Sequence, residues 1–226
     1  VGQGQPISRR EVWMSGSEGN NYKNLESFKP ESKSAVEYLI QTVNASPHAI
    51  EIIAIGPLTN IASAINASPE FVKNVKRLWI MGGDFTQSKV EHNFKCDTAA
   101  ARIVLESQIP ISILDLPNSQ KTIIRMPEID RIKDAPNLGP LLYSEIMSWI
   151  QPRNQDWTIP HDPIAALAMI APEYFDTSPK GQVSIDDDGK SFWKKSPSGN
   201  VTLLTPNDPE KAVERMLELI TNCSRA

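Results

Sequence analysis

The sequence contains little cysteine and no long apolar run. Only Cys96 and Cys223 occur among the 226 residues, so neither a disulfide framework nor a thiolate metal cage is expected. The clearest apolar run, residues 49–58, is shorter than the roughly 20 residues that a transmembrane helix needs. We therefore expect no membrane partner. The scarcity of cysteine favours a cytoplasmic location, and a secreted alternative stays open because Asn-x-Ser/Thr acceptors begin at Asn44, Asn66, Asn200 and Asn222.

An excess of basic residues is also missing. The chain has 23 Lys and Arg against 27 Asp and Glu, a formal net charge of -4 and a pI near 5.5. Such a chain has no broad positive field with which to hold a polyanion, so we expect no nucleic acid partner. The 40% hydrophobic content excludes intrinsic disorder and is typical of a globular chain, which we predict to form one domain over residues 1–226.

The first half of the chain alternates helical and strand patterns. Apolar residues at helical spacing over 36–43, with Ser34 and Glu37 as a capping box, predict an amphipathic helix. Strands are expected at 50–55, 77–81 and 111–114, and helices at 58–65 and 97–107. This alternation predicts an α/β fold with a mostly parallel open sheet flanked by helices.

The second half is less regular. Residues 141–150 and 163–170 have helical patterns, and 182–185 is a short strand candidate before a polar stretch at 186–200. The final helix has Asn207 or Asp208 as its cap and Pro209 in its first turn.

Ligands of open parallel sheets bind beyond the carboxyl ends of the strands, so the residues after each strand are candidates for a site. After the first strand, Ile55 and Gly56 form a turn in which the glycine lets a ligand approach the backbone, and Thr59 or Asn60 can cap the next helix. After the second strand, Met81 precedes a double glycine. Its thioether can line a pocket or simply pack in the core.

Glu91 and Asn93 stand two residues apart, ahead of the helix at 97–107. In an extended stretch this spacing points both side chains to the same side, as binding two hydroxyls of a sugar requires. A solvated loop carboxylate is the alternative for Glu91. Asp97 is better explained as the N-cap of the following helix than as a ligand.

His161 and Asp162 open a helix that is apolar nearly all round, and such a helix is buried. Asp162 can cap this helix, or it can bind a hard cation through its oxygens while His161 donates a proton. Both interpretations stay open on these residues alone.

Four motifs, taken together and in this order, resemble the inosine-uridine preferring nucleoside hydrolase family. They are Ile55-Gly56-Pro57-Leu58-Thr59-Asn60, Trp79-Ile80-Met81-Gly82-Gly83, Glu91-x-Asn93-Phe94-x-x-Asp97, and His161-Asp162-Pro163. The resemblance covers nearly the whole chain. It implies the nucleoside hydrolase fold, a nucleoside as the small-molecule partner, and hydrolysis of the N-glycosidic bond to free base and ribose.

The resemblance also implies a role for each matching residue. Asp162 and the backbone carbonyl of Ile55 would be ligands of a calcium ion, and Glu91 and Asn93 would bind ribose hydroxyls. Met81 would line the sugar pocket, and His161 would be the candidate acid for the leaving base. The calcium ion would hold the attacking water and lower its pKa.

The sequence departs from the family pattern in three places. The aspartate-rich motif Asp-x-Asp-x-Gly-x-Asp-Asp, which supplies most calcium ligands in the family, does not occur in the 226 residues. Residues 1–6 resemble a segment that follows it in the family, so we expect the first strand-helix units to be absent. The family loop His-Gly-x-Asp-Gly reads Ser15-Gly16-Ser17-Glu18-Gly19, and residues 86–90 lack a usual asparagine.

These departures leave two hypotheses. In one, the chain belongs to a longer nucleoside hydrolase and is inactive by itself. In the other, it is a divergent, inactive relative with a binding or structural role. Removal of a strand exposes its neighbour's edge, so we expect a homo-oligomer, as a dimer or tetramer, or association with the missing N-terminal segment.

Overall fold

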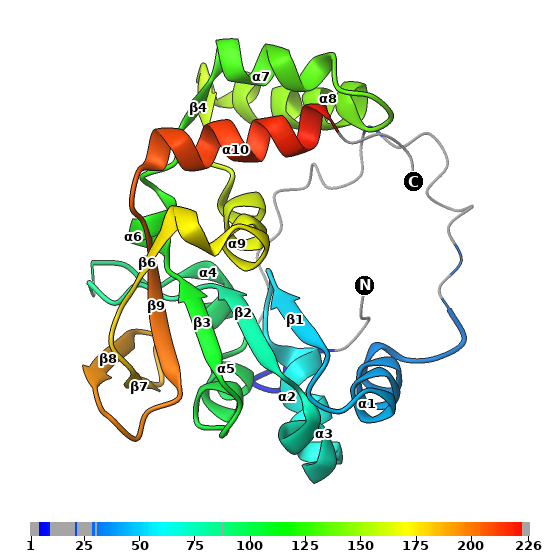
Figure 1. Ribbon diagram of the computed structural model, residues 1–226, viewed down its shortest axis with the longest axis vertical. Coiled ribbons are helices and arrows are strands. Elements are labelled where there is room, and N and C mark those ends of the chain that lie inside the picture. Colours follow the sequence, from blue (N-terminus) through cyan, green and yellow to red (C-terminus); the bar gives the residue numbers. More distant parts are fainter. Residues whose placement is uncertain (1–4, 10–20, 22–28, 30, 87, 223–226) are drawn as a thin grey trace.

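A seven-stranded mixed sheet forms the centre of the computed structural model, which describes residues 5–9, 21, 29, 31–86 and 88–222. The strands lie in the order β1-β2-β3-β9-β7-β8, with β6 also paired to β9 (Figure 1). β1, β2, β3 and β9 are parallel, whereas β6 and β7 pair antiparallel with β9. This arrangement confirms the expected α/β fold with a mostly parallel sheet.

The sheet strands are β1 (Glu51–Ala54), β2 (Arg77–Met81), β3 (Ile111–Leu114), β6 (Phe175–Thr177), β7 (Gly181–Ile185), β8 (Ser191–Lys195) and β9 (Val201–Pro206); β4 (Ile124–Arg125) and β5 (Trp157–Thr158) form a separate ribbon. The helices are α1 (Ala35–Ala45), α2 (Thr59–Ala67), α3 (Pro69–Asn74), α4 (His92–Cys96), α5 (Thr98–Leu105), α6 (Leu116–Ser119), α7 (Met126–Lys133), α8 (Gly139–Ile150), α9 (His161–Ile170) and α10 (Pro209–Thr221), with 3-10 turns at Gln151–Arg153 and Pro172–Tyr174.

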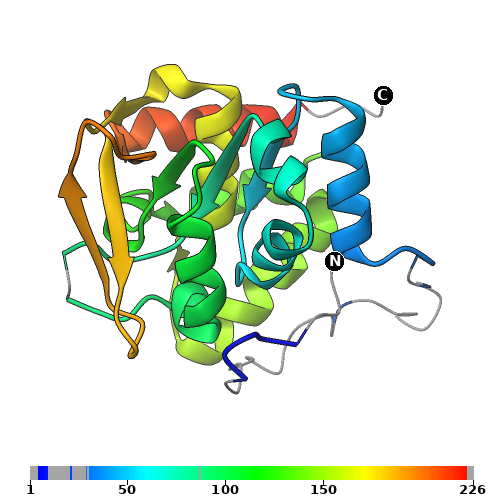
Figure 2. The same cartoon turned by 90° about the horizontal axis from the view of Figure 1, so that it is seen from below.

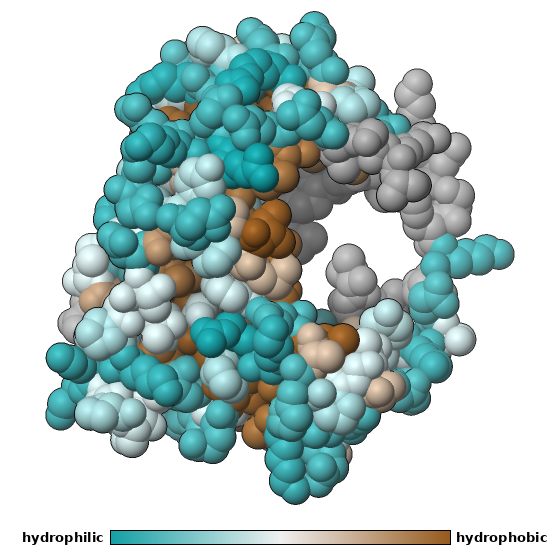
Figure 3. Space-filling view, viewed as in Figure 1, coloured by the Kyte–Doolittle hydropathy of each residue, from teal (hydrophilic) through white to brown (hydrophobic). Residues whose placement is uncertain are grey.

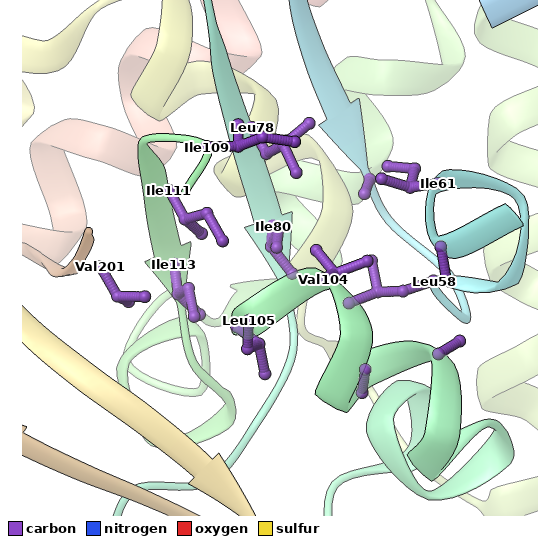
Figure 4. Close-up of a cluster of buried hydrophobic side chains, with 14 of the residues drawn as sticks. Leu58, Ile61, Leu78, Ile80, Val104, Leu105, Ile109, Ile111, Ile113 and Val201 are labelled. Carbon is purple, nitrogen blue, oxygen red and sulfur yellow. The ribbon is translucent and has the colours of Figure 1, made fainter. Parts of the chain in front are cut away.

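Alternate side chains of the strands enter two separate cores. Leu78 and Ile80 of β2 pack with α1, α2, α3 and α5 in one core, part of which Figure 4 shows. Trp79 and Met81 of the same strand contact the other core, which α7, α8, α9 and α10 share. Because side chains along a strand alternate between the two faces of a sheet, this division places helices on both faces of β2.

The local helix signals in the sequence are confirmed at several termini. Ser34 and Glu37 form the reciprocal capping box of α1, and Asp97 caps α5 by accepting from the Ala100 backbone N–H. Asp208, rather than Asn207, caps α10 through the Lys211 N–H. These side chains satisfy backbone donors that a helix start leaves free.

Two strands of the sheet, β8 and β9, are not predicted by the sequence patterns. β8 lies inside the stretch predicted as polar, where it pairs antiparallel with β7 across a turn. Gly189 of that turn has φ +96°, a conformation that glycine adopts without steric cost. The preceding Asp188 completes an Asp-Gly pair, which is a hairpin signal, so the sequence did contain a cue for β8.

The parallel strands β1, β2 and β3 end at the same edge of the sheet. Figure 1 places α9 beyond the carboxyl ends of β1 and β2, and Figure 2 shows α2 and α5 covering one face of these strands. Among the described strands, β1 pairs only with β2, so its other edge has no partner strand in the part of the chain that the structure describes.

Some sequence predictions fall outside the described residues. They concern Cys223, the loop Ser15-Gly16-Ser17-Glu18-Gly19 and residues 1–4. Cys96 is buried, and its sulfur lies 3.5 Å from Nε2 of His92. Of the helices described, none combines the length and apolar character that crossing a membrane requires.

The core packing generates a stability prediction. Ile113 is fully buried in the centre of β3, whereas Ile123 is 41% exposed. Ile113→Ala should lower the free energy of unfolding by about 2–5 kcal/mol, because it removes apolar contacts and leaves a cavity. Ile123→Ala is the matched control and should cost less than about 1 kcal/mol. Urea unfolding of both variants measures the difference, and equal losses would contradict the assignment of Ile113 to the core.

Candidate functional site

The buried carboxylate of Glu91 joins the turn after β2 to the start of α4. Its Oε2 accepts hydrogen bonds from the backbone N–H groups of Gly83 and Phe94, both at 3.0 Å, and its Oε1 accepts from the Asn93 N–H at 2.8 Å. The side chain is only 4% exposed. Three backbone donors therefore neutralise much of the cost of burying this charge.

This geometry corrects two expectations about Glu91. Residues 91–93 are not one extended stretch, because α4 begins at His92 and Glu91 is its N-cap. The solvated loop alternative is also wrong, since the carboxylate is buried. The physical reason is the same for both: the free N–H groups of the helix start and of the glycine turn attract the carboxylate inward.

Asn93 and Met81 are in direct contact. The Asn93 side-chain amide donates to the Met81 carbonyl oxygen at 3.0 Å, and its nitrogen lies 3.7 Å from the Met81 sulfur. Both residues are buried, at 8% and 4% exposure. Met81 belongs to the core on the α9 face of β2, so core packing is confirmed for it. It also lies beside Asn93, so the residue predicted to line the sugar pocket contacts one predicted to bind a ribose hydroxyl.

Asp162 lies in the first turn of α9, half-buried and facing the charge of Glu91. Burial raises the pKa of the Asp162 carboxyl from 3.8 to about 6, and the negative charge of Glu91 adds to the shift. No hydrogen bond joins this carboxylate to another residue in the described ranges. Pro160 is the N-cap residue of α9, so the capping role considered for Asp162 is wrong: the carboxylate does not turn back onto the helix N–H groups.

His161, the first residue of α9, contacts a serine that the sequence analysis did not identify. Its Nδ1 lies 2.7 Å from the Ser119 hydroxyl oxygen, and burial lowers the pKa of the imidazole below 6.5. Ser119 is the last residue of α6 and is fully buried. It lies 42 positions away in the sequence, and no local pattern marks it.

α6 follows β3 directly and is held by Asp115. This residue is its N-cap and accepts from both the backbone N–H and the side-chain amide of Asn118, at 3.2 and 2.7 Å. Burial raises the pKa of the Asp115 carboxyl. Asp115 thus resembles Glu91 in position, because each carboxylate caps a helix just beyond a parallel strand.

Ile55 follows β1 and is 48% exposed. A Cβ added at the next residue, Gly56, would meet nothing within 4 Å, so the backbone here is open to a ligand. Thr59 and Asn60 do not cap α2, whose N-cap position is Leu58. The reason is that the Thr59 hydroxyl donates at 2.7 Å to the buried carboxylate of Asp97 instead.

Asp97 has a wider role than the single cap expected from the sequence. In addition to the Ala100 and Thr59 donors, it accepts from the backbone N–H groups of Ile7 and Ser8 at 2.7 and 3.0 Å. These hydrogen bonds hold the pKa of Asp97 below its usual value although burial opposes them. Asp97 therefore ties residues 7–8 to α2 and α5.

The exposed surface near α9 is apolar. Figure 3 shows hydrophobic side chains around this helix, and its last residue, Ile170, is 59% exposed. The site therefore has polar side chains at the start of α9 and an apolar flank at its end, a combination found in small-molecule sites.

The fold matches that of solved nucleoside hydrolases. A plant nucleoside hydrolase, the PpNRh1 enzyme, superimposes with a TM-score of 0.81 and 25% identity, covering 91% of this chain and 72% of its own. The purine-preferring ribonucleoside hydrolase from Gardnerella vaginalis shares the fold, with a TM-score of 0.77, 22% identity, and coverage of 86% and 67%.

The sequence profile of the inosine-uridine preferring nucleoside hydrolase family matches residues 1–214, and the chain belongs to this family. Among curated relatives, the pyrimidine-specific ribonucleoside hydrolase RihA of Salmonella paratyphi B is 29% identical over 197 residues. The RihA of Salmonella paratyphi C is 30% identical over 198 residues. Each alignment covers 83% of this chain, which spans 63% of the length of these relatives.

The donor chemistry of the site fits a hard cation in part. A carboxylate such as Asp162, half-buried and without a hydrogen bond from the described residues, suits an oxygen-preferring ion. Calcium takes six to eight oxygens, however, and no group of three or more His, Cys, Asp or Glu residues among those described is arranged to hold a metal. Asp162 therefore fits the role of one ligand in a larger set.

The Glu91 contacts generate a stability prediction. Glu91→Gln replaces one acceptor oxygen by an NH2 group that faces backbone donors, and should lower the free energy of unfolding by about 1–3 kcal/mol. Glu106→Gln, on the exposed end of α5, is the matched control and should have little effect. Denaturant unfolding checks both, and a neutral Glu91→Gln would show that the three hydrogen bonds do not hold the turn.

The raised pKa of Asp162 predicts an unusual pH dependence. Because the folded-state pKa of about 6 exceeds the unfolded value, the ionised carboxylate destabilises the fold above that pH, and the cost disappears as the pH falls toward 4. With a chelator present at about pH 8, Asp162→Asn should raise the free energy of unfolding by about 1–3 kcal/mol, an amount reduced by solvent screening.

The difference between Asp162→Asn and the unchanged protein should vanish near pH 4, where both side chains are neutral. Thermal unfolding across this pH range measures it. A variant that is less stable at every pH would mean that the Asp162 carboxylate makes a favourable contact in the fold.

Proposed function

We propose that the protein containing this chain is a ribonucleoside hydrolase, which cleaves the N-glycosidic bond and releases a free base and ribose. One observation carries the proposal: Glu91, Asn93 and Met81 form one hydrogen-bonded unit at the carboxyl end of β2, with Asp162 close enough for Glu91 to raise its pKa. Family membership and the RihA relatives support the same reaction class.

Glu91 and Asn93 are the proposed ribose-binding residues. A carboxylate offers about four acceptor positions, and the backbone uses three of them here. The carbonyl oxygen of the Asn93 side chain is also free to accept, since its amide nitrogen alone is engaged by the described residues. Each of the two side chains can therefore accept a hydrogen bond from one sugar hydroxyl. Their hydrogen bonds to the backbone hold both acceptor atoms in place.

Asp162 and the carbonyl of Ile55 are the proposed ligands for a divalent cation. Both donors are oxygens, which suit a hard ion such as calcium, the ion that the family resemblance implies. When bound, the cation lowers the pKa of a coordinated water and so provides a nucleophile. Asp162 contributes a negative charge to the cation. Its carboxylate is half-buried and has no hydrogen bond from the described residues, so its oxygens are available as ligands.

His161 is the proposed acid for the leaving base. Burial lowers the pKa of its ring, so the protonated imidazole is a stronger acid than free histidine and gives up its proton readily. The transition state of glycoside cleavage resembles an oxocarbenium ion. A proton delivered to the base neutralises the negative charge that the base gains as the N-glycosidic bond breaks.

The similarity supports both purine and pyrimidine nucleosides as substrates. The curated relatives named above are pyrimidine-specific, whereas the Gardnerella vaginalis enzyme is purine-preferring. Because this chain spans 63% of the length of the curated relatives, the proposal concerns the protein expressed from its complete reading frame, and the test uses that protein.

The test is release of free base from inosine, guanosine, uridine and cytidine with calcium present. Asn93→Ala should lower kcat/KM by about tenfold to a hundredfold, the value of a hydrogen bond to the substrate, and excess chelator should abolish turnover. Asn74→Ala, which removes a surface amide bonded to Asn44, is the matched control and should leave kcat/KM unchanged.

Failure to release base from any of the four nucleosides would contradict the proposed function. It would favour the second hypothesis, an inactive relative with a binding or structural role. Nucleoside binding without turnover, measured by calorimetry, would distinguish binding from a purely structural role.

A further inference from the structure

Ser119 links His161 to the backbone of α6. Its hydroxyl oxygen lies 2.7 Å from Nδ1 of His161 and 3.0 Å from the Leu116 carbonyl oxygen. Ser119 is 0% exposed, so water does not replace either contact. The Ser119 carbonyl is itself engaged by the buried hydroxyl of Thr122 at 2.7 Å, which fixes the end of α6.

The number of protons decides how these groups are connected. A serine hydroxyl has one proton, and a carbonyl oxygen only accepts. If the proton points to Leu116, then Nδ1 of His161 must carry the other proton, and two hydrogen bonds form in series. If it points to Nδ1 instead, only one hydrogen bond forms, and the buried hydroxyl oxygen accepts nothing from the described residues.

The arrangement with two bonds is favoured, because it contains one more hydrogen bond and leaves no buried hydroxyl oxygen without a donor. It also suits a protonated ring, in which both nitrogens are donors. Only this arrangement lets Ser119 keep one orientation in both states of the ring.

We propose that Ser119 is a positioning residue, which holds a proton on Nδ1 of His161 and leaves Nε2 as the nitrogen that exchanges a proton with the ligand. No hydrogen bond from the described part of the chain reaches Nε2, so this nitrogen is available. A fixed partner on one ring nitrogen is a common way to set the tautomer and orientation of a functional histidine.

The functional meaning of this inference rests on the proposed hydrolase activity, whereas the hydrogen bonding does not. With Nδ1 always protonated, the leaving base would receive its proton from Nε2, and the ring would return to the same tautomer after each turnover. Ser119 would act on the reaction only through His161, without touching the substrate.

The experiment is nitrogen NMR of the full chain with 15N-labelled histidine, which distinguishes the two neutral tautomers. The chain has three histidines, His48, His92 and His161, and His161→Gln assigns the third signal. At about pH 8, above the ordinary imidazole pKa of about 6.5, we expect the Nδ1–H form for His161. Ser119→Ala should lower the ratio of this form to the Nε2–H form by about twofold to tenfold, the value of one hydrogen bond.

Ser112→Ala is the matched control. Ser112 is also a buried serine, 2% exposed, but its hydroxyl is bonded to Arg77 and Thr202 in the sheet. Ser112→Ala should leave the His161 signal unchanged. The signals of the other two histidines should be the same in every variant. A purely structural role of Ser119 would change the melting temperature but not the tautomer.

An Nε2–H signal for His161 in the unchanged protein would overturn the inference, and this measurement needs no variant. An unchanged tautomer ratio in a folded Ser119→Ala variant would overturn it as well. If the chain shows the Nδ1–H form but the protein hydrolyses no nucleoside, the proposed function fails and the inference about Ser119 stands.

Discussion

The carboxylate of Glu91 is the point on which the site depends. It accepts hydrogen bonds from backbone N–H groups in the turn after β2 and at the start of α4. It therefore holds the backbone of both Gly83 and Asn93 in place. Asn93 is then held against Met81. Because the carboxylate is buried and charged, moving any of these groups would leave it short of donors, which costs more than an ordinary hydrogen bond.

The neighbouring α9 has the opposite character. Its first turn holds a half-buried carboxylate, Asp162, without a hydrogen bond from the described residues and with its pKa raised to about 6. A fold tolerates such a group at a cost of stability, and unpaired, perturbed carboxyls are concentrated at functional sites. Glu91 accepts three backbone hydrogen bonds, Asp162 accepts none from the described residues, and the negative charge of Glu91 raises the pKa of Asp162.

The sequence was most informative where structure is local. The spacing over residues 36–43 and the Ser34–Glu37 box specify α1 because both depend on neighbours within one turn. The strand expected at 77–81 is β2 with the same bounds, and its apolar side chains enter both cores. The four motifs identify the family, and they contain Glu91, Asn93, His161 and Asp162 of the candidate site.

The sequence was least informative where contacts are distant. The extended stretch expected at Glu91 does not form. Its carboxylate accepts a hydrogen bond from Gly83, across a turn, and this contact has no signature in the local sequence. Ser119 has no local signature, since only the fold brings α6 beside α9. Thr59 has the residue type of a cap, but its hydroxyl donates a hydrogen bond to Asp97, 38 positions away. In each case the structure depends on a hydrogen bond to a buried carboxylate or imidazole that the local sequence does not predict.

Asp162 is the proposed cation ligand beside the proposed ribose site. Calorimetric titration of Ca²⁺ into the protein from its complete reading frame, compared with Asp162→Asn, tests it most directly. We expect the unchanged protein to bind one ion per chain, and the variant to bind at least about tenfold more weakly, because an anionic oxygen ligand is lost. Equal affinity in the two proteins would contradict the claim.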